Sequence, residues 1–250
     1  MIPLKSERDL AMMRQAGRII AKIMQKIARF IREGISTEEI NRLAEELVYK
    51  ENALPAFKGY KGFPTVICTS VNEEIVHGIP DKRLLKDGDI LSLDLGINYQ
   101  GYFVDVAVTL PIGEIESGKK KLLSVTRRAL SEGIKQMREN NYLSNISYAI
   151  QNYVERQGFS VVRQFVGHGI GRALHEEPQI PNFGRPNEGP LLKRGMVFAI
   201  EPMVNMGTWE LEILDNGWTA VTKDRLPSCH FEHTVALTEK GPEILTQFFL

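Results

Sequence analysis

ILSLDLGINYQGYFVDVAVTL, residues 90–110, is the stretch that decides the fold. Two apolar, strand-like runs flank Asn98-Tyr-Gln-Gly101, a segment typical of a tight turn, so the stretch is predicted to form a β-hairpin. Each run carries an aspartate in its middle, Asp94 and Asp105. Aspartate is depleted in strands, and a buried carboxylate is costly unless positive charge compensates it. The pair therefore indicates a bound cation.

The register of the hairpin determines how the two aspartates lie. With Tyr99 and Gln100 as the loop, Asp94 is expected directly opposite Asp105, where like charges repel unless a cation lies between them. A G1 bulge at Gly101 is the alternative, and it shifts the register by one residue. The face-to-face arrangement is therefore an expectation that depends on the turn.

Three more candidate ligands lie in or beside other apolar segments. Glycines flank His168 and allow backbone and ligand to approach closely. Glu201 ends one apolar run, and Glu232 lies within another. Together with the aspartate pair, these residues form one candidate site of four carboxylates and one imidazole.

The charge of this candidate site predicts how many ions it binds. Four carboxylates are neutralised by two divalent cations, whereas one cation leaves two negative charges uncompensated. A paired-metal site, with ions roughly 3.5–4 Å apart, is the better match. One nitrogen among oxygen ligands suits Mn, Fe, Co or Zn and differs from a closed Cys/His structural zinc site.

The composition excludes several classes of protein. The chain has 250 residues, 43 % of them hydrophobic, with 31 basic and 31 acidic residues. Zero net charge argues against a dedicated nucleic-acid binder and a polybasic membrane anchor. The charged start does not resemble a secretory leader, and no apolar run is long enough for a membrane span. Only Cys68 and Cys229 are cysteines, without a CxxC motif, which favours a reduced, cytoplasmic protein.

The order of the predicted elements repeats. Helices are expected at Glu7–Glu33, ended by Gly34, from Ser36 or Thr37 to about Asn52, at Lys119–Met137 and at Asn145–Gln157, and a strand at Val66–Val71. Two rounds of helix, helix, strand and hairpin predict one α+β domain over residues 1–250. Its pseudo-twofold antiparallel sheet would carry helices on its outer face and the site on its concave face.

Several motifs together resemble type I methionine aminopeptidases. Besides the aspartate pair they are Asn72-Glu-Glu-Ile-Val-His-Gly-Ile-Pro80, Gly167-His-Gly-Ile-Gly-Arg172, His175-Glu-Glu-Pro178, Ile200-Glu-Pro-Met203, Trp218-Thr-Ala220 and His230-Phe-Glu-His-Thr234. The resemblance covers nearly the whole chain. It implies the pita-bread fold and removal of the initiator methionine from nascent proteins and peptides by dinuclear-metal-assisted hydrolysis. The chain would be the short, bacterial-type form.

The resemblance also implies a role for each metal ligand. Asp94 would bind the first metal, Asp105 and Glu232 would bridge both metals, and His168 and Glu201 would complete the second. Two divalent ions, Co, Mn, Fe or Zn, would then be the cofactors. Glu201 is in addition the candidate for moving a proton from water to the leaving amine.

Substrate-binding residues follow from the same resemblance. His175 would stabilise the carbonyl oxygen, and His77 would hydrogen-bond near the scissile nitrogen. The pocket for the methionine side chain would be built by Tyr60, Phe63, Cys68 and Trp218. Leu174 stands where an aromatic residue often occurs in the family, and Phe57 stands where a cysteine can occur. These two residues concern the shape of the pocket.

A purely structural role is expected for some histidine and cysteine residues. His233 is expected to be a hydrogen-bonded residue without a role in the site, and both cysteines are expected to be small buried residues rather than nucleophiles.

Two alternative functions remain at the level of the sequence. One is an Xaa-Pro aminopeptidase or prolidase, whose members usually carry an extra N-terminal domain before the first helix found here. The other is a metal-free interaction module with the pita-bread fold, which the retained set of five ligand types disfavours. The expected partners are nascent polypeptide N-termini near the ribosome, without a nucleic-acid motif, a membrane or a second copy of the chain.

Overall fold

The computed structural model describes residues 2–248. The helices are α1 (Glu7–Phe30), α2 (Thr37–Lys50), the short 3-10 helix η1 (Tyr60–Gly62), α3 (Ser117–Lys135) and α4 (Ser144–Arg156). The strands are β1 (Leu54–Pro55), β2 (Cys68–Val71), β3 (Glu74–Val76), β4 (Ile90–Tyr99), β5 (Tyr102–Pro111), β6 (Ser160–Val161), β7 (Gly167–Gly169), β8 (Glu176–Ile180), β9 (Val197–Ile200), β10 (Met203–Asn205), β11 (Leu211–Ile213), β12 (Ala220–Thr222), β13 (Ser228–His230), β14 (Glu232–Thr238) and β15 (Gly241–Ile244).

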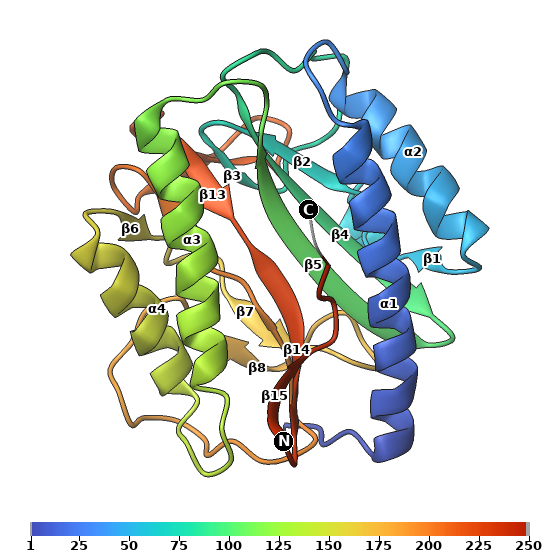
Figure 1. The fold of residues 1–250 in the computed structure, drawn as a ribbon, viewed down its shortest axis with the longest axis vertical. Coiled ribbons are helices and arrows are strands. Elements are labelled where there is room, and N and C mark those ends of the chain that lie inside the picture. The colour runs from blue at the N-terminus through green and yellow to red at the C-terminus, as the bar shows by residue number, and fades with distance from the viewer. Residues whose placement is uncertain (1, 249–250) are drawn as a thin grey trace.

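The main sheet is antiparallel and has nine strands. Its order is β1-β4-β5-β14-β9-β7-β8, with β2 beside β4 and β15 beside β14. Two smaller sheets, β13-β10-β6 and β11-β12-β3, adjoin it. Figure 1 shows α1 to α4 on one face of the main sheet, where α1 packs on β4 and β5 and α3 packs on β9 and β13. The predicted α+β class, with helices on one face of an antiparallel sheet, is confirmed.

The two halves of the chain repeat the same order. Helices α1 and α2 precede β2, β4 and β5, and helices α3 and α4 precede β7, β9 and β14. The central strands of the sheet, β5 and β14, pair across the join with Glu232 opposite Ala107. The predicted twofold element order therefore brings the ends of both halves together at the middle of the sheet.

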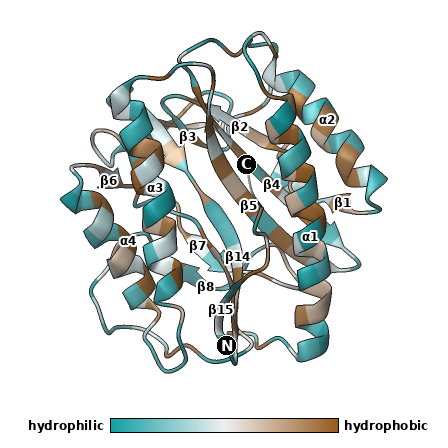
Figure 2. Ribbon diagram, in the orientation of Figure 1, coloured by the Kyte–Doolittle hydropathy of each residue, from teal (hydrophilic) through white to brown (hydrophobic). Residues whose placement is uncertain are grey.

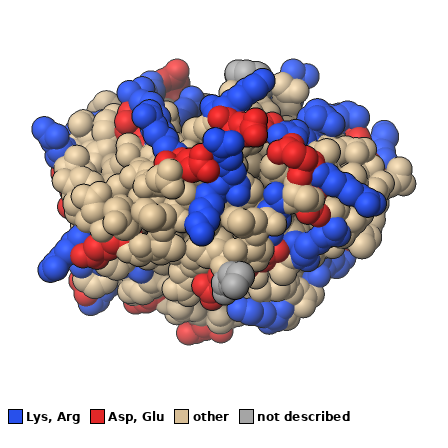
Figure 3. All heavy atoms as spheres, turned by 90° about the horizontal axis from the view of Figure 1, so that it is seen from below, with Lys and Arg blue, Asp and Glu red and all other residues tan. Residues whose placement is uncertain are grey.

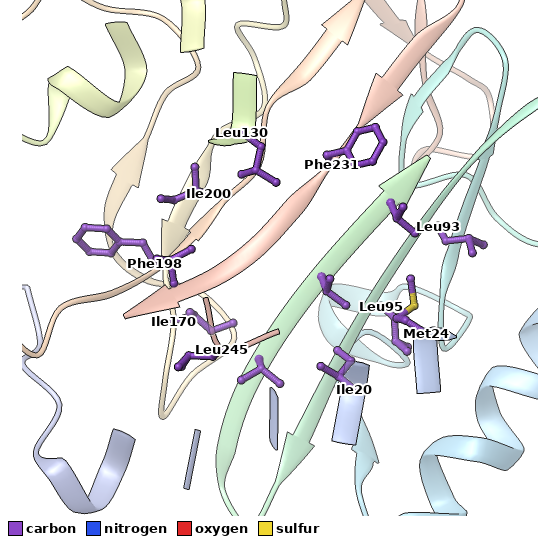
Figure 4. Close-up of a cluster of buried hydrophobic side chains, with 14 of the residues drawn as sticks. Ile20, Met24, Leu93, Leu95, Leu130, Ile170, Phe198, Ile200, Phe231 and Leu245 are labelled. Carbon is purple, nitrogen blue, oxygen red and sulfur yellow. The ribbon is translucent and has the colours of Figure 1, made fainter. Parts of the chain in front are cut away.

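Alternation along β4 separates the core from the opposite face. Leu93 and Leu95 are fully buried in the same hydrophobic cluster as Ile20 and Met24 of α1 (Figure 4). Asp94 lies between the two leucines and so points away from the helices, because successive strand residues face opposite sides. Figure 2 shows the matching pattern, in which β4 and β5 are mostly hydrophobic while the helices also carry hydrophilic residues.

Helix ends follow local backbone chemistry. Helix α1 ends at Phe30 because Ile31 is already extended, so the predicted end at Glu33 was wrong, and Gly34 belongs to the following turn with φ +83°. Ser36 is the N-cap of α2 and forms a complete capping box with Glu39, whose carboxylate accepts the Ser36 N–H at 2.8 Å.

The remaining boundaries lie close to the predicted ones. Helices α3 and α4 match their predicted ranges to within two residues at each end. The strand expected from Val66 is shorter, because β2 begins at Cys68.

The turn between β4 and β5 differs from the prediction. Tyr99 pairs with Tyr102, so the loop consists of Gln100 and Gly101. Both loop residues have positive φ, +52° and +81°, as a type I′ turn requires. Glycine adopts this conformation without steric cost, and the right-handed twist of the strands favours it.

This turn shifts the hairpin register by two residues from the expected one. Asp94 pairs with Ala107, and Asp105 pairs with Gly96. The expected direct opposition of the two aspartates was therefore wrong, and the alternative one-residue shift does not occur either. Both aspartates nevertheless remain on the same face of the hairpin, as diagonal neighbours.

The described surface carries mixed charge. Figure 3 shows Lys and Arg side chains interspersed with Asp and Glu on the face seen from below, in agreement with the zero net charge. Within residues 2–248, every helix is too short or too polar to cross a membrane.

Candidate active site

A cavity of about 250 Å³ opens on the sheet face that points away from the helices. All five predicted metal ligands line it: Asp94, Asp105, His168, Glu201 and Glu232. The cavity is also lined by the predicted substrate-binding residues, His77, His175, Tyr60, Phe63, Cys68 and Trp218. Leu174 and Phe57, the two residues expected to alter the shape of the pocket, line it as well. Side chains from both halves of the chain therefore meet at one place.

The strand register brings the carboxylates together. Asp94, Ala107 and Glu232 stand in one row across β4, β5 and β14. The pairing of β14 with β9 continues beyond the ladder, because the Phe231 N–H donates to the Pro202 carbonyl at 3.3 Å. Glu201 consequently lies beside Glu232. A small alanine side chain occupies the row between the two acidic ones, which leaves space in front of the sheet.

Thr234 fixes the backbone around Asp105. Its hydroxyl accepts the Asp105 N–H at 2.9 Å and donates to the Asp105 carbonyl at 2.8 Å. The carboxylate of Asp105 accepts the Val106 N–H at 2.9 Å through Oδ1. Asp105 is 4 % exposed, so its other oxygen is available to a ligand inside the cavity rather than to bulk water.

His168 is held in a defined orientation. A Cβ at Gly167 would lie 2.5 Å from the Ala199 carbonyl oxygen, and one at Gly169 would lie 2.1 Å from that of Glu177, so only glycine allows this close strand packing. Nδ1 of His168 lies 2.9 Å from the Gly169 carbonyl oxygen. Because a carbonyl only accepts, Nδ1 carries the proton and Nε2 keeps its lone pair.

The ligand atoms are close enough to share metal ions. Ligand atoms of Asp105, His168 and Glu232 all lie within 4.8 Å of one another. Oε1 of Glu201 lies 3.5 Å from Nε2 of His168. Metal-binding histidines usually donate their second ring N–H to a carbonyl or carboxylate oxygen, as His168 does to Gly169, and here several carboxylates also surround the ring.

The electrostatics of the site show how costly it is without a cation. Burial, with repulsion from neighbouring carboxylates, raises the pKa values of Asp94, Glu201 and Glu232 well above their usual range. Burial also raises the pKa of Asp105 to about 7. The pKa of His168 is lowered to about 4, again mainly by burial, so this imidazole is neutral at pH 7 and can bind a metal.

Two buried carboxylate oxygens of the site lack a hydrogen-bond partner within residues 2–248. Oδ1 of Asp94 and Oε1 of Glu232 make no hydrogen bond within the described part of the chain. Unpaired buried carboxylate oxygens carry a large desolvation cost, which divalent cations would remove. The donor set and the orphaned oxygens both fit divalent metal ions at this place.

His175 and His77 line the cavity beside different neighbours. Nδ1 of His175 is 2.9 Å from the Tyr60 hydroxyl, the two rings stack, and the His175 ring centroid is 4.2 Å from that of His168. His77 packs edge-on against Phe165 at 5.1 Å, and burial lowers its pKa to about 4. Both imidazoles are therefore beside the metal-ligand cluster without being among its closest members.

An apolar pocket adjoins the carboxylates. Phe63 packs edge-on against Trp218 at 5.1 Å and against Phe57 at 6.5 Å. Cys68 pairs with Asp94 across β2 and β4, so the pocket and the metal ligands share a strand pair. Burial raises the pKa of the Cys68 thiol well above its usual value, which favours a packing role over nucleophilic chemistry.

Some cavity residues were not predicted. His230 is 2 % exposed, its Nε2 has no partner within residues 2–248, and it lies 3.7 Å from Oε2 of Glu201. The signal for it was available, because His230 precedes Glu232 by two residues on the same strand face. Phe165, Val166, Val76, Met203 and Lys61 also line the cavity.

His233 lies away from the cavity. Its Nδ1 is 3.1 Å from the Thr246 hydroxyl, and its side chain faces a separate cleft beneath the C-terminal segment. This position agrees with the expected structural role.

Comparisons with known proteins agree with this geometry. The sequence model of metallopeptidase family M24 matches residues 11–239. Methionine aminopeptidase 1 of Bacillus subtilis is 53 % identical over 247 residues, which cover 99 % of this chain and 100 % of that protein. The crystal structures of methionine aminopeptidases from Thermotoga maritima and Rickettsia prowazekii are 45 % and 40 % identical, each with a TM-score of 0.97 over 99 % of this chain and 100 % of theirs.

Proposed function

The chain belongs to metallopeptidase family M24 and to the methionine aminopeptidases within it, and we infer from this premise that it removes the N-terminal methionine from peptides and proteins. One observation supports this function most strongly. Five carboxylate and imidazole ligands and an apolar, aromatic pocket line the same cavity of about 250 Å³. A peptidase specific for an apolar first residue needs both features within reach of one scissile bond.

Asp94, Asp105, His168, Glu201 and Glu232 would hold two divalent ions, chosen among Mn, Fe, Co and Zn. Their four carboxylates match the charge of two such ions, and their mixture of oxygens with one nitrogen suits these metals. Bound there, the ions would supply Lewis-acid chemistry, which activates a water molecule and polarises a carbonyl group.

The protein's own groups would move the proton and stabilise developing charge. Glu201 is the proton acceptor of choice, because its carboxylate lines the cavity 3.5 Å from Nε2 of His168, within reach of a metal-bound water. His175, oriented by Tyr60, would donate a hydrogen bond to the carbonyl oxygen of the scissile peptide. His77, which also lines the cavity, would hydrogen-bond near the scissile nitrogen.

The apolar pocket would select the side chain. Phe63, Trp218 and Tyr60 offer aromatic surface, and Cys68 offers a small polarisable one. Sulfur contacts with aromatic rings are favourable, so an unbranched thioether fits better than a branched aliphatic group.

The cellular setting is inferred from the same premise. The substrates would be N-termini of nascent polypeptides near the ribosome, bound by a single chain that acts as one catalytic domain over residues 1–250. Cys68 and Cys229 are both buried and free, which supports a reducing compartment such as the cytoplasm.

The two alternative functions have less support. High identity to methionine aminopeptidases along their full length disfavours an Xaa-Pro peptidase. A metal-free module has no need for orphaned carboxylate oxygens in a cavity.

A peptide panel tests the proposal. Purified protein loaded with Mn or Co is expected to cleave Met-Ala and Met-Gly peptides and to act poorly on Leu-first and Val-first peptides. Cleavage of Ala-Pro peptides with Met-Ala left intact would move the chain to the Xaa-Pro class. No cleavage of any peptide with two ions bound would favour the interaction module.

A further inference from the structure

The segment before α1 contacts the loop that carries His175. Lys5 forms an ion pair with Oε2 of Glu176, and the two side chains are only 6 % and 11 % exposed. The Lys5 N–H also donates to the Gly195 carbonyl at 2.7 Å. An ion pair this deeply buried costs desolvation of both charges, so its partners are placed with little freedom.

Glu176 in turn fixes the backbone of the loop. Its Oε1 accepts the N–H of Arg172 at 2.6 Å and that of Ala173 at 3.2 Å. Lys5 lies directly over Gly171, where an added Cβ would stand 2.1 Å from Cε of the lysine. One carboxylate therefore holds the lysine with one oxygen and two backbone amides of the loop with the other.

The same loop carries a residue of the proposed reaction. His175 directly precedes Glu176. The centroid of its ring lies 4.2 Å from that of His168, and its Nδ1 lies 2.9 Å from the Tyr60 hydroxyl. Glu176 opens strand β8, and its carboxylate holds the backbone amides of Arg172 and Ala173, so the segment on both sides of His175 is fixed by the same residue. The contact between Lys5 and Glu176 therefore helps to set the position of the His175 imidazole, which is only one peptide unit away.

We propose that Lys5 is a positioning residue of the active site, which acts on catalysis by holding the Glu176 carboxylate and, through it, the imidazole of His175. This inference rests on the proposed function for the role of His175. It assigns a positioning task to the segment before α1, of which the described residues 2–6 do not line the cavity.

The test uses Lys5→Met and His175→Ala, alone and together, with Arg14→Met as matched control. Arg14 forms an ion pair with Glu243 between α1 and β15, with bonds of 2.8 Å; this pair is more exposed than that of Lys5, and neither residue lines the cavity. Lys5→Met is expected to lower kcat by about 10-fold or more while leaving KM within about twofold, because misplacement of a transition-state group lowers kcat selectively. Arg14→Met should leave kcat unchanged, although both variants lose an ion pair.

The double variant separates positioning from general destabilisation. If Lys5 acts through His175, the Lys5→Met change should add nothing, within about twofold, to the kcat of His175→Ala. Hydrogen exchange at residues 170–176 should accelerate in Lys5→Met but not in Arg14→Met. Should Lys5→Met fail to fold, Glu176→Gln replaces it, since it keeps an oxygen for the two amides and loses the charge that attracts the lysine.

Each result decides between the two proposals. Wild-type kcat and wild-type exchange in Lys5→Met would overturn the positioning role, as would an equal loss of kcat in the His175→Ala background. Wild-type kcat in His175→Ala would instead remove His175 from the proposed reaction, while the exchange measurement would still show whether Lys5 holds the loop.

Discussion

Nε2 of His168 lies 3.5 Å from Oε1 of Glu201, although His168 belongs to β7 and Glu201 directly follows β9. Donors that each lie about 2.1 Å from one ion are separated by roughly 3 Å or slightly more. Burial lowers the pKa of His168 to about 4, so the contact at pH 7 joins a neutral imidazole to a carboxyl group rather than two opposite charges. The pair is therefore arranged as two ligands of a common metal more naturally than as a salt bridge.

Glu232→Ala is expected to abolish turnover. Glu232 is 2 % exposed and stands in the same sheet row as Asp94, with Glu201 beside it, so its loss removes a ligand that both ions would share. Metal affinity should fall by more than about 100-fold, since loss of mere outer-sphere partners already costs 10–100-fold. Glu239→Ala, in the exposed turn directly after β14, should behave like the wild type. Substantial turnover of Glu232→Ala at saturating metal would exclude the bridging role.

Metal-free protein is expected to lose stability as the pH rises above about 6.5. Burial raises the pKa of Asp105 to about 7 and those of the other three carboxyl groups well above normal, so the folded protein holds protons that the unfolded chain has released. Each proton that only the folded state holds lowers the free energy of unfolding by about 1.4 kcal/mol per pH unit, until the folded state releases it.

The buried histidines act in the opposite direction but at lower pH. The pKa values of His77 and His168 are lowered to about 4, so their contribution to stability grows as the pH rises to about 6.5 and is then complete. Urea unfolding in the presence of a chelator at about pH 6.5 and about pH 8 tests whether the free energy of unfolding falls as the pH rises. Equal stability at both pH values would mean that the four carboxylates are not protonated in the metal-free fold. Added Mn should reverse the trend, because bound metal replaces the protons.

His77→Ala should retain both ions and lose activity. The ring packs against Phe165 and Trp218 and is not part of the closest ligand cluster. A transition-state hydrogen bond lost at this position lowers kcat by about 10²-fold with little change in KM. Metal analysis of the sample tests whether both ions are retained, and steady-state kinetics on the same sample test whether activity is lost. Loss of metal together with activity would reassign His77 as a ligand.

Gly96→Ala should impair substrate binding through Phe57. A Cβ at Gly96 would lie 2.7 Å from the Phe57 ring, which lines the cavity, so alanine pushes this ring toward the substrate. We expect kcat/KM for Met-Ala peptides to fall about 10-fold, in line with the cost of about 1–3 kcal/mol for one misfitting methyl group. The additional change Phe57→Ala should restore most of the lost kcat/KM. Failure of this rescue would show that Gly96 is needed for another reason.

The sequence was sufficient for the parts of the site that depend on composition and periodicity. Asp94 and Asp105 were identifiable because a charge inside an apolar strand has few explanations, and alternation placed both on one face. Their register was not predictable, since it depends on whether Gln100 adopts positive φ, which is unusual for a residue with a side chain.

Contacts between distant segments were also beyond the sequence. Nothing local in the segment around Lys5 indicates that it would meet Glu176, because the two residues approach only after the sheet has formed. His230 was overlooked although strand alternation already placed it on the same face as Glu232. Its significance comes from the unpaired Nε2 and the carboxylate of Glu201 near it, which a strand pattern alone does not provide.

The most direct test of the account is the number of ions bound at saturation. Metal-free wild-type protein is titrated with Mn or Co in a calorimeter, and the saturated sample is analysed for metal after removal of free ions. Four buried carboxylates with raised pKa values predict two divalent ions per chain, bound with release of protons. A single bound ion per chain, in a sample that cleaves Met-Ala at its full rate, would contradict the paired-metal site.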